Sequence, residues 1–132
     1  MAANVGIVLV SHSAQLAEGT ADLAGQVGGG TVTIASAGGT DDGRLGTSIA
    51  KIRRALQLAD AGAGVLILPD LGSSVLTVRA LLAEPDDLPG PVVMADAPFV
   101  EGAVAAAVTA AAGGDLKAVL DAAQEARHAR KL

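Results

Sequence analysis

The 132-residue sequence contains no cysteine, tryptophan or tyrosine, and its single phenylalanine is Phe99. The lack of cysteine excludes disulfides, zinc–thiolate sites, iron–sulfur clusters and a thiol nucleophile. With almost no aromatic side chains, the chain offers no platform on which nucleic-acid bases could stack. Its net charge of −5 also opposes binding to a phosphate backbone. We therefore expect no nucleic-acid partner.

Long hydrophobic runs are also missing. The longest apolar stretch outside the N-terminal region, 103–112, includes Thr109 and falls well short of a membrane span. The N-terminal run Val5–Val10 follows no basic segment and is too short for a signal peptide, so we expect a cytoplasmic protein without a membrane partner. Because 51% of the residues are hydrophobic, the sequence predicts one folded domain over residues 1–132.

Short apolar runs alternate with helix-sized segments along the whole chain. Continuous apolarity over about five residues is typical of parallel strands that are covered on both faces. The predicted strands are Val5–Val10, Thr31–Ala35, Gly64–Leu68 and Pro91–Ala95, and the predicted helices are 14–27, 46–60, 73–84, 99–112 and 115–130. The order β-α-β-α-β-α-β-α-α predicts an α/β fold, with a parallel sheet of about four strands and helices on both faces.

The predicted helices have apolar residues at helical spacing. In 14–27 these are Leu16, Leu23 and Val27. In 73–84 the pattern runs through Leu76, Arg79 and Ala80, then Leu82 and Ala83. Such spacing is typical of a helix that packs one face on a core.

His12 follows the first predicted strand directly, in Ser11-His12-Ser13. Ligands of open parallel sheets gather beyond the carboxyl ends of the strands, and the free amides of the next helix favour a phosphoryl group there. The hydroxyls of Ser11 and Ser13 can cap that helix and donate to phosphate oxygens. The alternative is a surface or capping histidine. The second histidine, His128, lies in a basic tail and is expected to be only solvated.

Asp70 follows the third predicted strand. In a 2-1-3-4 strand order, strands one and three are neighbours, so His12 and Asp70 would face each other. A carboxylate that accepts a proton from one ring nitrogen leaves the other as a nucleophile. The alternative is that Asp70 only caps the next helix, and Asp42 could compete as the carboxylate partner.

A glycine-rich loop, 37–48, precedes the second predicted helix. It has no Gly-Lys-Ser/Thr ending and is therefore not a Walker A loop. The loop either lines the pocket above His12, with Arg44 as the charge that could meet a partner, or is a flexible connection. Phe99 and Glu101 lie at the start of a later predicted helix. We expect the Glu101 carboxylate to interact favourably with the helix dipole and the Phe99 ring to pack in the core.

At this point the sequence resembles a known family. Val8-Leu9-Val10-Ser11-His12-Ser13, with Leu16-Ala17-Glu18-Gly19 after it, is similar to the start of the mannose-type enzyme IIA domain of the bacterial phosphotransferase system. Further segments resemble the members that donate phosphoryl groups to a phosphotransferase-dependent dihydroxyacetone kinase. These segments are Gly39-Thr40-Asp41-Asp42, Leu45-Gly46-Thr47-Ser48, Asp70-Leu71-Gly72-Ser73 and Ala97-Pro98-Phe99-Val100-Glu101-Gly102-Ala103.

The resemblance implies a phosphotransferase subunit without a cofactor or metal of its own. His12 would accept a phosphoryl group from phospho-HPr, with Asp70 orienting it, and pass the group to ADP on the nucleotide-binding kinase subunit. Ser11, Ser13, Gly39, Thr40 and Ser73 would bind the phosphoryl group or line its pocket. Implied partners are HPr, the kinase subunits that bind ADP and dihydroxyacetone, and a second copy in a homodimer. HPr and enzyme I would act in trans.

Two other functions remain open at this stage. One is a sugar-transport IIA domain that passes phosphate to a IIB protein, and the other is a regulatory module of the same fold.

Overall fold

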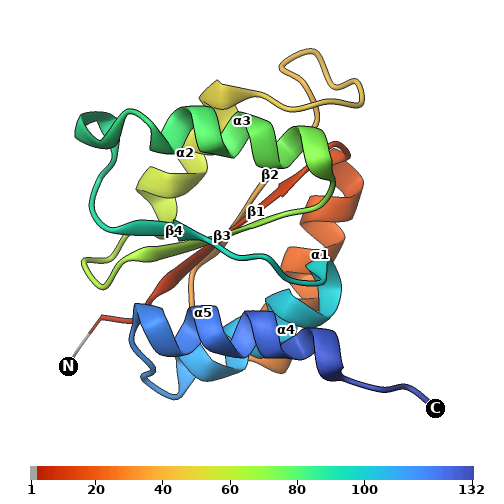
Figure 1. The fold of residues 1–132 in the computed structure, drawn as a ribbon, viewed down its shortest axis with the longest axis vertical. Helices are drawn as coiled ribbons and strands as arrows, with labels where there is room; N and C mark the ends of the chain where they lie inside the picture. Colours follow the sequence, from red (N-terminus) through yellow and green to blue (C-terminus); the bar gives the residue numbers. More distant parts are fainter. Residues whose placement is uncertain (1–2) are drawn as a thin grey trace.

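The computed structural model describes residues 3–132; Met1 and Ala2, the start of the predicted domain, lie outside the described residues. Four parallel strands form one sheet in the order β2-β1-β3-β4 (Figure 1). The strands are β1 (Gly6–Ser11), β2 (Ile34–Gly38), β3 (Val65–Pro69) and β4 (Val92–Met94). The α-helices are α1 (Ala14–Val27), α2 (Ile49–Ala59), α3 (Gly72–Leu82), α4 (Phe99–Ala111) and α5 (Leu116–Glu125). The predicted α/β fold with a four-stranded parallel sheet is confirmed.

Helices cover both faces of the sheet. Figure 1 shows α2 and α3 on one side and α1, α4 and α5 on the other. The central strands β1 and β3 are buried along their full length because their side chains enter one core on each face. The layer of α1, α4 and α5 packs through small residues, among them Ala24, Ala103 and Ala107. Small side chains allow these elements to approach each other and the sheet closely.

Some predicted boundaries are wrong. The second strand runs from Ile34 to Gly38 rather than over Thr31–Ala35, since it pairs with β1 from Ile7↔Ile34 to Ser11↔Gly38. The second helix begins at Ile49, where the side chain of Ser48 caps it. The last helix ends at Glu125 and continues only as a 3-10 turn, Ala126–His128. An unpredicted 3-10 turn also lies at Pro85–Asp87.

The predicted apolar faces of two helices do not pack on the sheet. In α1 the buried residues are Ala17, Thr20 and Ala24, whereas Leu16, Leu23 and Val27 are about half exposed. In α3 the buried residues are Ser74, Val78 and Leu81, whereas Leu76, Arg79 and Ala80 face solvent. Of the predicted α3 residues, Leu82 is partly buried against the core. Helical spacing shows that a face is apolar, and the space left by neighbouring elements decides which face is buried.

Candidate functional site

The first and third strands bring His12 and Asp70 together. The two strands are neighbours in parallel register, with Val10 opposite Pro69, so the residues that follow them lie at the same edge. The backbone N–H of Asp70 donates to the carbonyl of Val10 at 3.0 Å and extends this ladder. Strand register therefore brings the predicted pair of His12 and Asp70 together, because equivalent positions on adjacent parallel strands lie side by side.

The Asp70 carboxylate is the centre of the hydrogen-bond network. Its Oδ2 accepts from the Ser11 hydroxyl at 2.9 Å and from the backbone N–H of His12 at 3.0 Å. Its Oδ1 accepts from the backbone N–H of Leu71 at 2.7 Å and from the Ser74 hydroxyl at 3.0 Å. The His12 ring completes the set, with 2.9 Å between Nδ1 and Oδ1. The side chain of Asp70 is only 7% exposed, so these hydrogen-bond donors surround its carboxylate in place of water.

These hydrogen bonds keep Asp70 ionised. Burial by itself would raise the pKa of the carboxyl, but the donors from His12, Ser11 and Leu71 outweigh burial and lower the pKa from 3.8 to about 2. An ionised carboxylate can only accept hydrogen bonds, so the nitrogen that faces it, Nδ1 of His12, carries the ring proton. In the neutral ring the lone pair is then on Nε2.

Nε2 of His12 lies at the start of α3, where it contacts the Ser73 hydroxyl. Because Nε2 is unprotonated in this tautomer, Ser73 Oγ is the donor. The α3 N-cap, Leu71, provides no side-chain cap, and no hydrogen bond among residues 3–132 uses the backbone N–H of Gly72 or Ser73. Free amides at a helix N-terminus stabilise an anion. The lone pair therefore faces a position where a phosphoryl group would be stabilised.

Ser11 and Ser13 support this arrangement in different ways. Ser11 is fully buried, donates to Asp70 and accepts from the backbone N–H of Ser13 at 3.0 Å. Ser13 caps α1 by accepting from the backbone N–H of Leu16 at 3.2 Å. The sequence predicted both residues for phosphate binding. In this structure their hydroxyl groups make hydrogen bonds within the protein, and they hold His12 between β1 and α1.

The glycine-rich loop is attached to the same strand ends. The backbone N–H of Gly46 donates to the His12 carbonyl at 2.9 Å, and that of Gly39 donates to the Ser11 carbonyl at 3.1 Å. Thr40 bonds within the loop, to the Asp42 carboxylate and to the backbone N–H of Arg44. Asp42 thus pairs with Thr40 and Arg44, and the carboxylate that meets His12 is Asp70.

The remaining predicted residues lie away from this network. Glu101 is in the first turn of α4 and pairs with Lys131 at 3.2 Å, and Phe99 packs against the core beneath α4. His128 is exposed in the last 3-10 turn. Sequence reasoning missed the direct bond of Ser74 to Asp70. The only available signal was a second serine after Asp70 in Leu71-Gly72-Ser73-Ser74.

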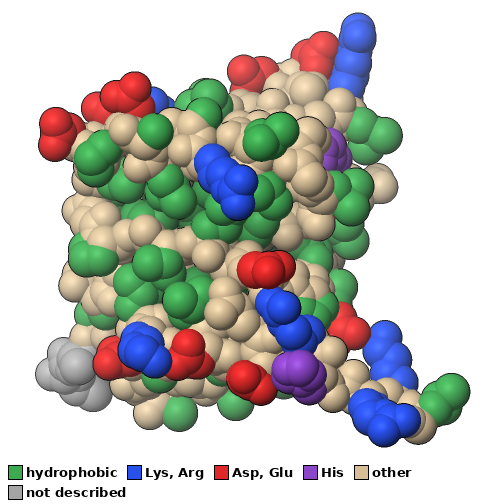
Figure 2. Space-filling view, viewed as in Figure 1, with side chains coloured by type: hydrophobic (Ala, Val, Ile, Leu, Met, Phe, Trp, Pro, Cys, Tyr) green, Lys and Arg blue, Asp and Glu red, His purple; other side chains and the backbone are tan. Residues whose placement is uncertain are grey.

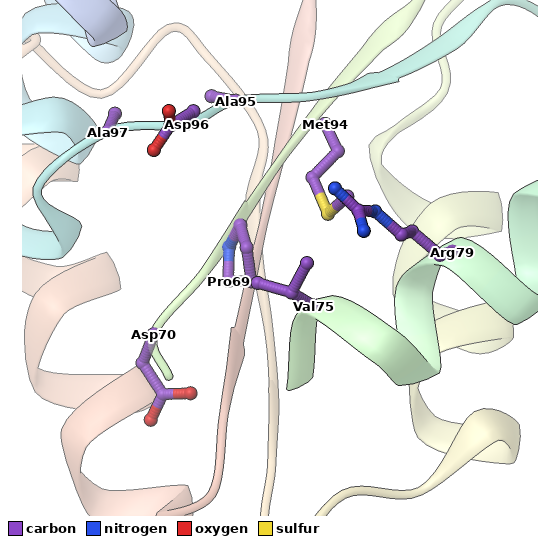
Figure 3. A pocket seen from close by; sticks show the side chains of 8 residues that line it. All are labelled: Pro69, Asp70, Val75, Arg79, Met94, Ala95, Asp96 and Ala97. Carbon is purple, nitrogen blue, oxygen red and sulfur yellow. The ribbon is translucent and has the colours of Figure 1, made fainter. Parts of the chain in front are cut away.

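A groove of about 390 Å³ opens beside Asp70, between α3 and the segment that follows β4 (Figure 3). Its lining mixes apolar side chains, among them Val75 and Met94, with the charged Asp70, Asp96 and Arg79, and the Arg79 guanidinium points into it. Within residues 3–132, no cluster of three or more His, Cys, Asp or Glu side chains is placed to hold a metal ion. None of the helices in that range is long and apolar enough to cross a membrane.

Comparison with known proteins gives consistent matches. Residues 6–120 match the EIIA-man family model, described as the PTS system fructose IIA component. A phosphoryl donor subunit DhaM of PEP-dependent dihydroxyacetone kinase from Pantoea ananatis is 39% identical over 96% of this chain, and one from Escherichia coli is 36% identical over 96%. The chain spans only 28% of the length of either relative.

A shorter relative matches over most of both chains. The phosphoryl donor subunit DhaM of PEP-dependent dihydroxyacetone kinase 2 from Listeria innocua is 38% identical, with 88% of this chain and 94% of the relative covered. The crystal structure of EF1359, described as a protein of unknown function, superposes with a TM-score of 0.81 at 38% identity, covering 92% of this chain and 94% of that one. Sequence and structure agree, and the chain belongs to the EIIA-man family of phosphotransferase-system IIA components.

Proposed function

We propose that this chain is the phosphoryl carrier of a PEP-dependent dihydroxyacetone kinase. His12 accepts a phosphoryl group from phospho-HPr and passes it to ADP on the nucleotide-binding subunit, which phosphorylates the dihydroxyacetone held by its partner subunit. The observation that carries the proposal is the His12–Asp70 pair, with Nδ1 bound to the carboxylate and Nε2 at the start of α3. The names of the relatives support the kinase over a sugar transporter or a regulatory module.

The tautomer indicates which nitrogen reacts. The lone pair of Nε2 attacks the phosphorus of the donor, the donor's N–P bond breaks, and its electron pair returns to the donor nitrogen. The ring of phosphorylated His12 keeps the proton on Nδ1 and carries positive charge, which the Asp70 carboxylate stabilises. In the second step an oxygen of the terminal phosphate of ADP attacks the same phosphorus, and the electron pair returns to Nε2.

Ser73 and the start of α3 serve the phosphoryl group in this proposal. The Ser73 hydroxyl occupies the approach to Nε2, so it turns toward a phosphoryl oxygen when the group arrives. The free N–H groups of Gly72 and Ser73, at the same helix start, are fixed dipoles that can stabilise these oxygens. Gly39 and Thr40 stay assigned to the rim of the site, since their loop is bonded to the end of β1.

The direct test is phosphorylation with phosphoenolpyruvate, enzyme I and HPr. We expect an acid-labile mass increase of one phosphoryl group, which is absent in His12→Ala and retained in His128→Ala. Loss of the label on adding the kinase subunits with ADP would identify the acceptor. If the protein gains no mass while HPr is fully charged, the proposal is wrong. We also propose that the carrier is cytoplasmic. We propose further that it is a homodimer, and sedimentation equilibrium can check this oligomeric state.

A further inference from the structure

The first turn of α3 is positioned by hydroxyl groups. Its N-cap, Leu71, makes no side-chain cap hydrogen bond, and Arg79 in the last turn is the only charged residue of the helix. No ion pair among residues 3–132 involves α3. Figure 2 accordingly shows mostly green and tan surface over this helix. Hydrogen bonds of neutral side chains therefore have to hold the turn that contacts His12.

Two threonines form such a link. Thr77 lies one turn after Ser73 in α3, and its hydroxyl donates to the Ser73 carbonyl at 3.0 Å. Thr47 Oγ1 lies 3.1 Å from Thr77 Oγ1. A hydroxyl has a single proton, and Thr77 gives its proton to Ser73, so Thr47 is the donor between the two threonines. The hydrogen bonds thus run from Thr47 through Thr77 to the residue whose hydroxyl contacts Nε2 of His12.

Thr47 is attached to the backbone of His12. It follows Gly46, whose N–H donates to the His12 carbonyl at 2.9 Å. The contacts therefore close a ring around the reacting side chain. The ring runs from the His12 carbonyl through Gly46 and Thr47 to Thr77, and then through Ser73 to the imidazole of His12.

The threonine pair holds a side of the α3 turn that the Asp70 carboxylate does not reach. Asp70 accepts from the hydroxyl of Ser74, which is fully buried beneath the helix. The contact of Thr47 with Thr77 is the only side-chain hydrogen bond between loop 37–48 and α3 within residues 3–132. Both threonines are partly buried, which limits competition from water. The pair therefore fixes the start of α3 relative to the loop.

We propose that Thr47 and Thr77 are positioning residues for phosphoryl transfer, because their hydroxyl pair keeps the Ser73 hydroxyl at Nε2 of His12. The inference rests on the proposed function, in which Ser73 serves the phosphoryl group. As Nε2 bonds to phosphorus and the donor's bond to phosphorus breaks, the Ser73 hydroxyl turns from Nε2 to a phosphoryl oxygen and keeps its own proton. A donor that is already in place needs no reorganisation at that moment, and its hydrogen bond weakens steeply when it is displaced.

The test exchanges single hydroxyl groups for methyl groups. Thr47→Val and Thr77→Val remove either side of the pair at nearly constant shape, and Thr77→Ser restores the hydroxyl. Thr109→Val is the matched control, because Thr109 is a partly buried threonine of α4, on the opposite face of the sheet. Single-turnover charging is measured with phospho-HPr over a range of concentrations, and with phosphoramidate, a small donor that needs no protein contact. In the unphosphorylated protein, the 15N resonance of Nε2 of His12 reports the contact with Ser73.

The expected effect has an upper limit. Since the pair acts through Ser73, its loss costs no more than loss of the Ser73 hydroxyl itself, about tenfold. Both valine variants should lower the maximal charging rate about fivefold with either donor, and KM for phospho-HPr should stay within about twofold of the wild type. Thr77→Ser and Thr109→Val should charge like the wild type. In both valine variants the Nε2 resonance should move toward its position in Ser73→Ala.

A double variant separates positioning from stability. In a Ser73→Ala background no hydroxyl is left to position, so Thr77→Val should then change the charging rate by less than about twofold. Urea unfolding of the same samples measures any general loss of stability. An equally large rate effect in that background would overturn the inference, as would wild-type rates in both valine variants. A raised KM for phospho-HPr at an unchanged rate with phosphoramidate would also overturn it, in favour of a contact with the partner.

Failure of the proposed function gives a different result. If the wild type is charged by phosphoramidate but not by phospho-HPr, the proposed donor is wrong, whereas the phosphoramidate rates and the Nε2 resonance still decide the role of Thr47 and Thr77. If neither donor phosphorylates His12, the proposed function fails, and the positioning role in phosphoryl transfer fails with it.

Discussion

Replacing Asp70 by asparagine tests how the site selects the reacting nitrogen. The side chain keeps its size but exchanges one acceptor oxygen for a donor NH2. If the NH2 takes the place of Oδ2, it faces the backbone N–H of His12, which then has no acceptor. If it takes the place of Oδ1, it faces the Leu71 N–H and the His12 ring, which can respond only by moving its proton from Nδ1 to Nε2. Either orientation disturbs a network in which all five contacts donate to the carboxylate.

The expected sizes follow from these contacts. A buried N–H without an acceptor costs about 1–3 kcal/mol, so the free energy of unfolding should fall by about 2 kcal/mol while the fold remains. We expect the NH2 in place of Oδ1, because the Leu71 N–H that loses its acceptor there is more exposed than the His12 N–H. In that orientation the proton on Nε2 removes the lone pair that attacks phosphorus. Transfer from phospho-HPr should slow on the order of 10⁴-fold, the effect of replacing the orienting aspartate of a serine-protease triad by asparagine.

The assay is single-turnover charging of the protein by phospho-HPr, alongside urea unfolding of the same samples. Asp96→Asn is the matched control, because Asp96 follows the neighbouring strand β4 but is 94% exposed, and its one ion pair among residues 3–132, with Arg127, spans 3.5 Å. It should change neither measurement appreciably. A folded Asp70→Asn protein that is charged at the wild-type rate would refute the view that Asp70 sets the tautomer of His12.

Three further predictions use the same measurements. Because the pKa of Asp70 is about 2 in the fold and 3.8 when unperturbed, its ionisation should contribute about 2 kcal/mol above about pH 4 and lose that contribution toward pH 2. Urea midpoints should therefore fall more steeply over that range in the wild type than in Asp70→Asn. Ser73→Ala removes the exposed hydroxyl at Nε2 and should slow charging about tenfold at an unchanged urea midpoint; equal rates would remove Ser73 from the site. Gly6→Ala would place Cβ 2.0 Å from the Ala59 carbonyl oxygen and should lower the free energy of unfolding by about 3 kcal/mol. Gly19→Ala, whose Cβ would have nothing within 4 Å, should raise that free energy by about 0.5–1 kcal/mol. Similar urea midpoints for the two variants would contradict the packing argument.

The sequence by itself determined the fold class and the central pair of the site. Runs such as Gly64–Leu68 alternate with helix-sized segments, which identifies a parallel sheet. Because parallel strands end at one edge, the position of His12 and Asp70 directly after two strands was sufficient to predict their contact, once the strand order was assumed. Local chemistry also gave Ser11 and Ser13 as the candidate caps of α1, of which Ser13 is the cap.

The tertiary structure alone decided which surfaces are buried and which groups share the site. Spacing marked Leu16 and Leu76 as members of apolar faces, but the small residues Ala17 and Ala24 fit the close packing of α1, so the larger side chains stay outside. The bond of Ser74 to Asp70 depends on how α3 begins, which no periodicity specifies. The same holds for Arg79, whose place in a groove beside Asp70 arises from the approach of α3 to the end of β4. Distances between elements far apart in sequence depend on side-chain volumes across the whole core, and a pattern read along one segment does not contain them.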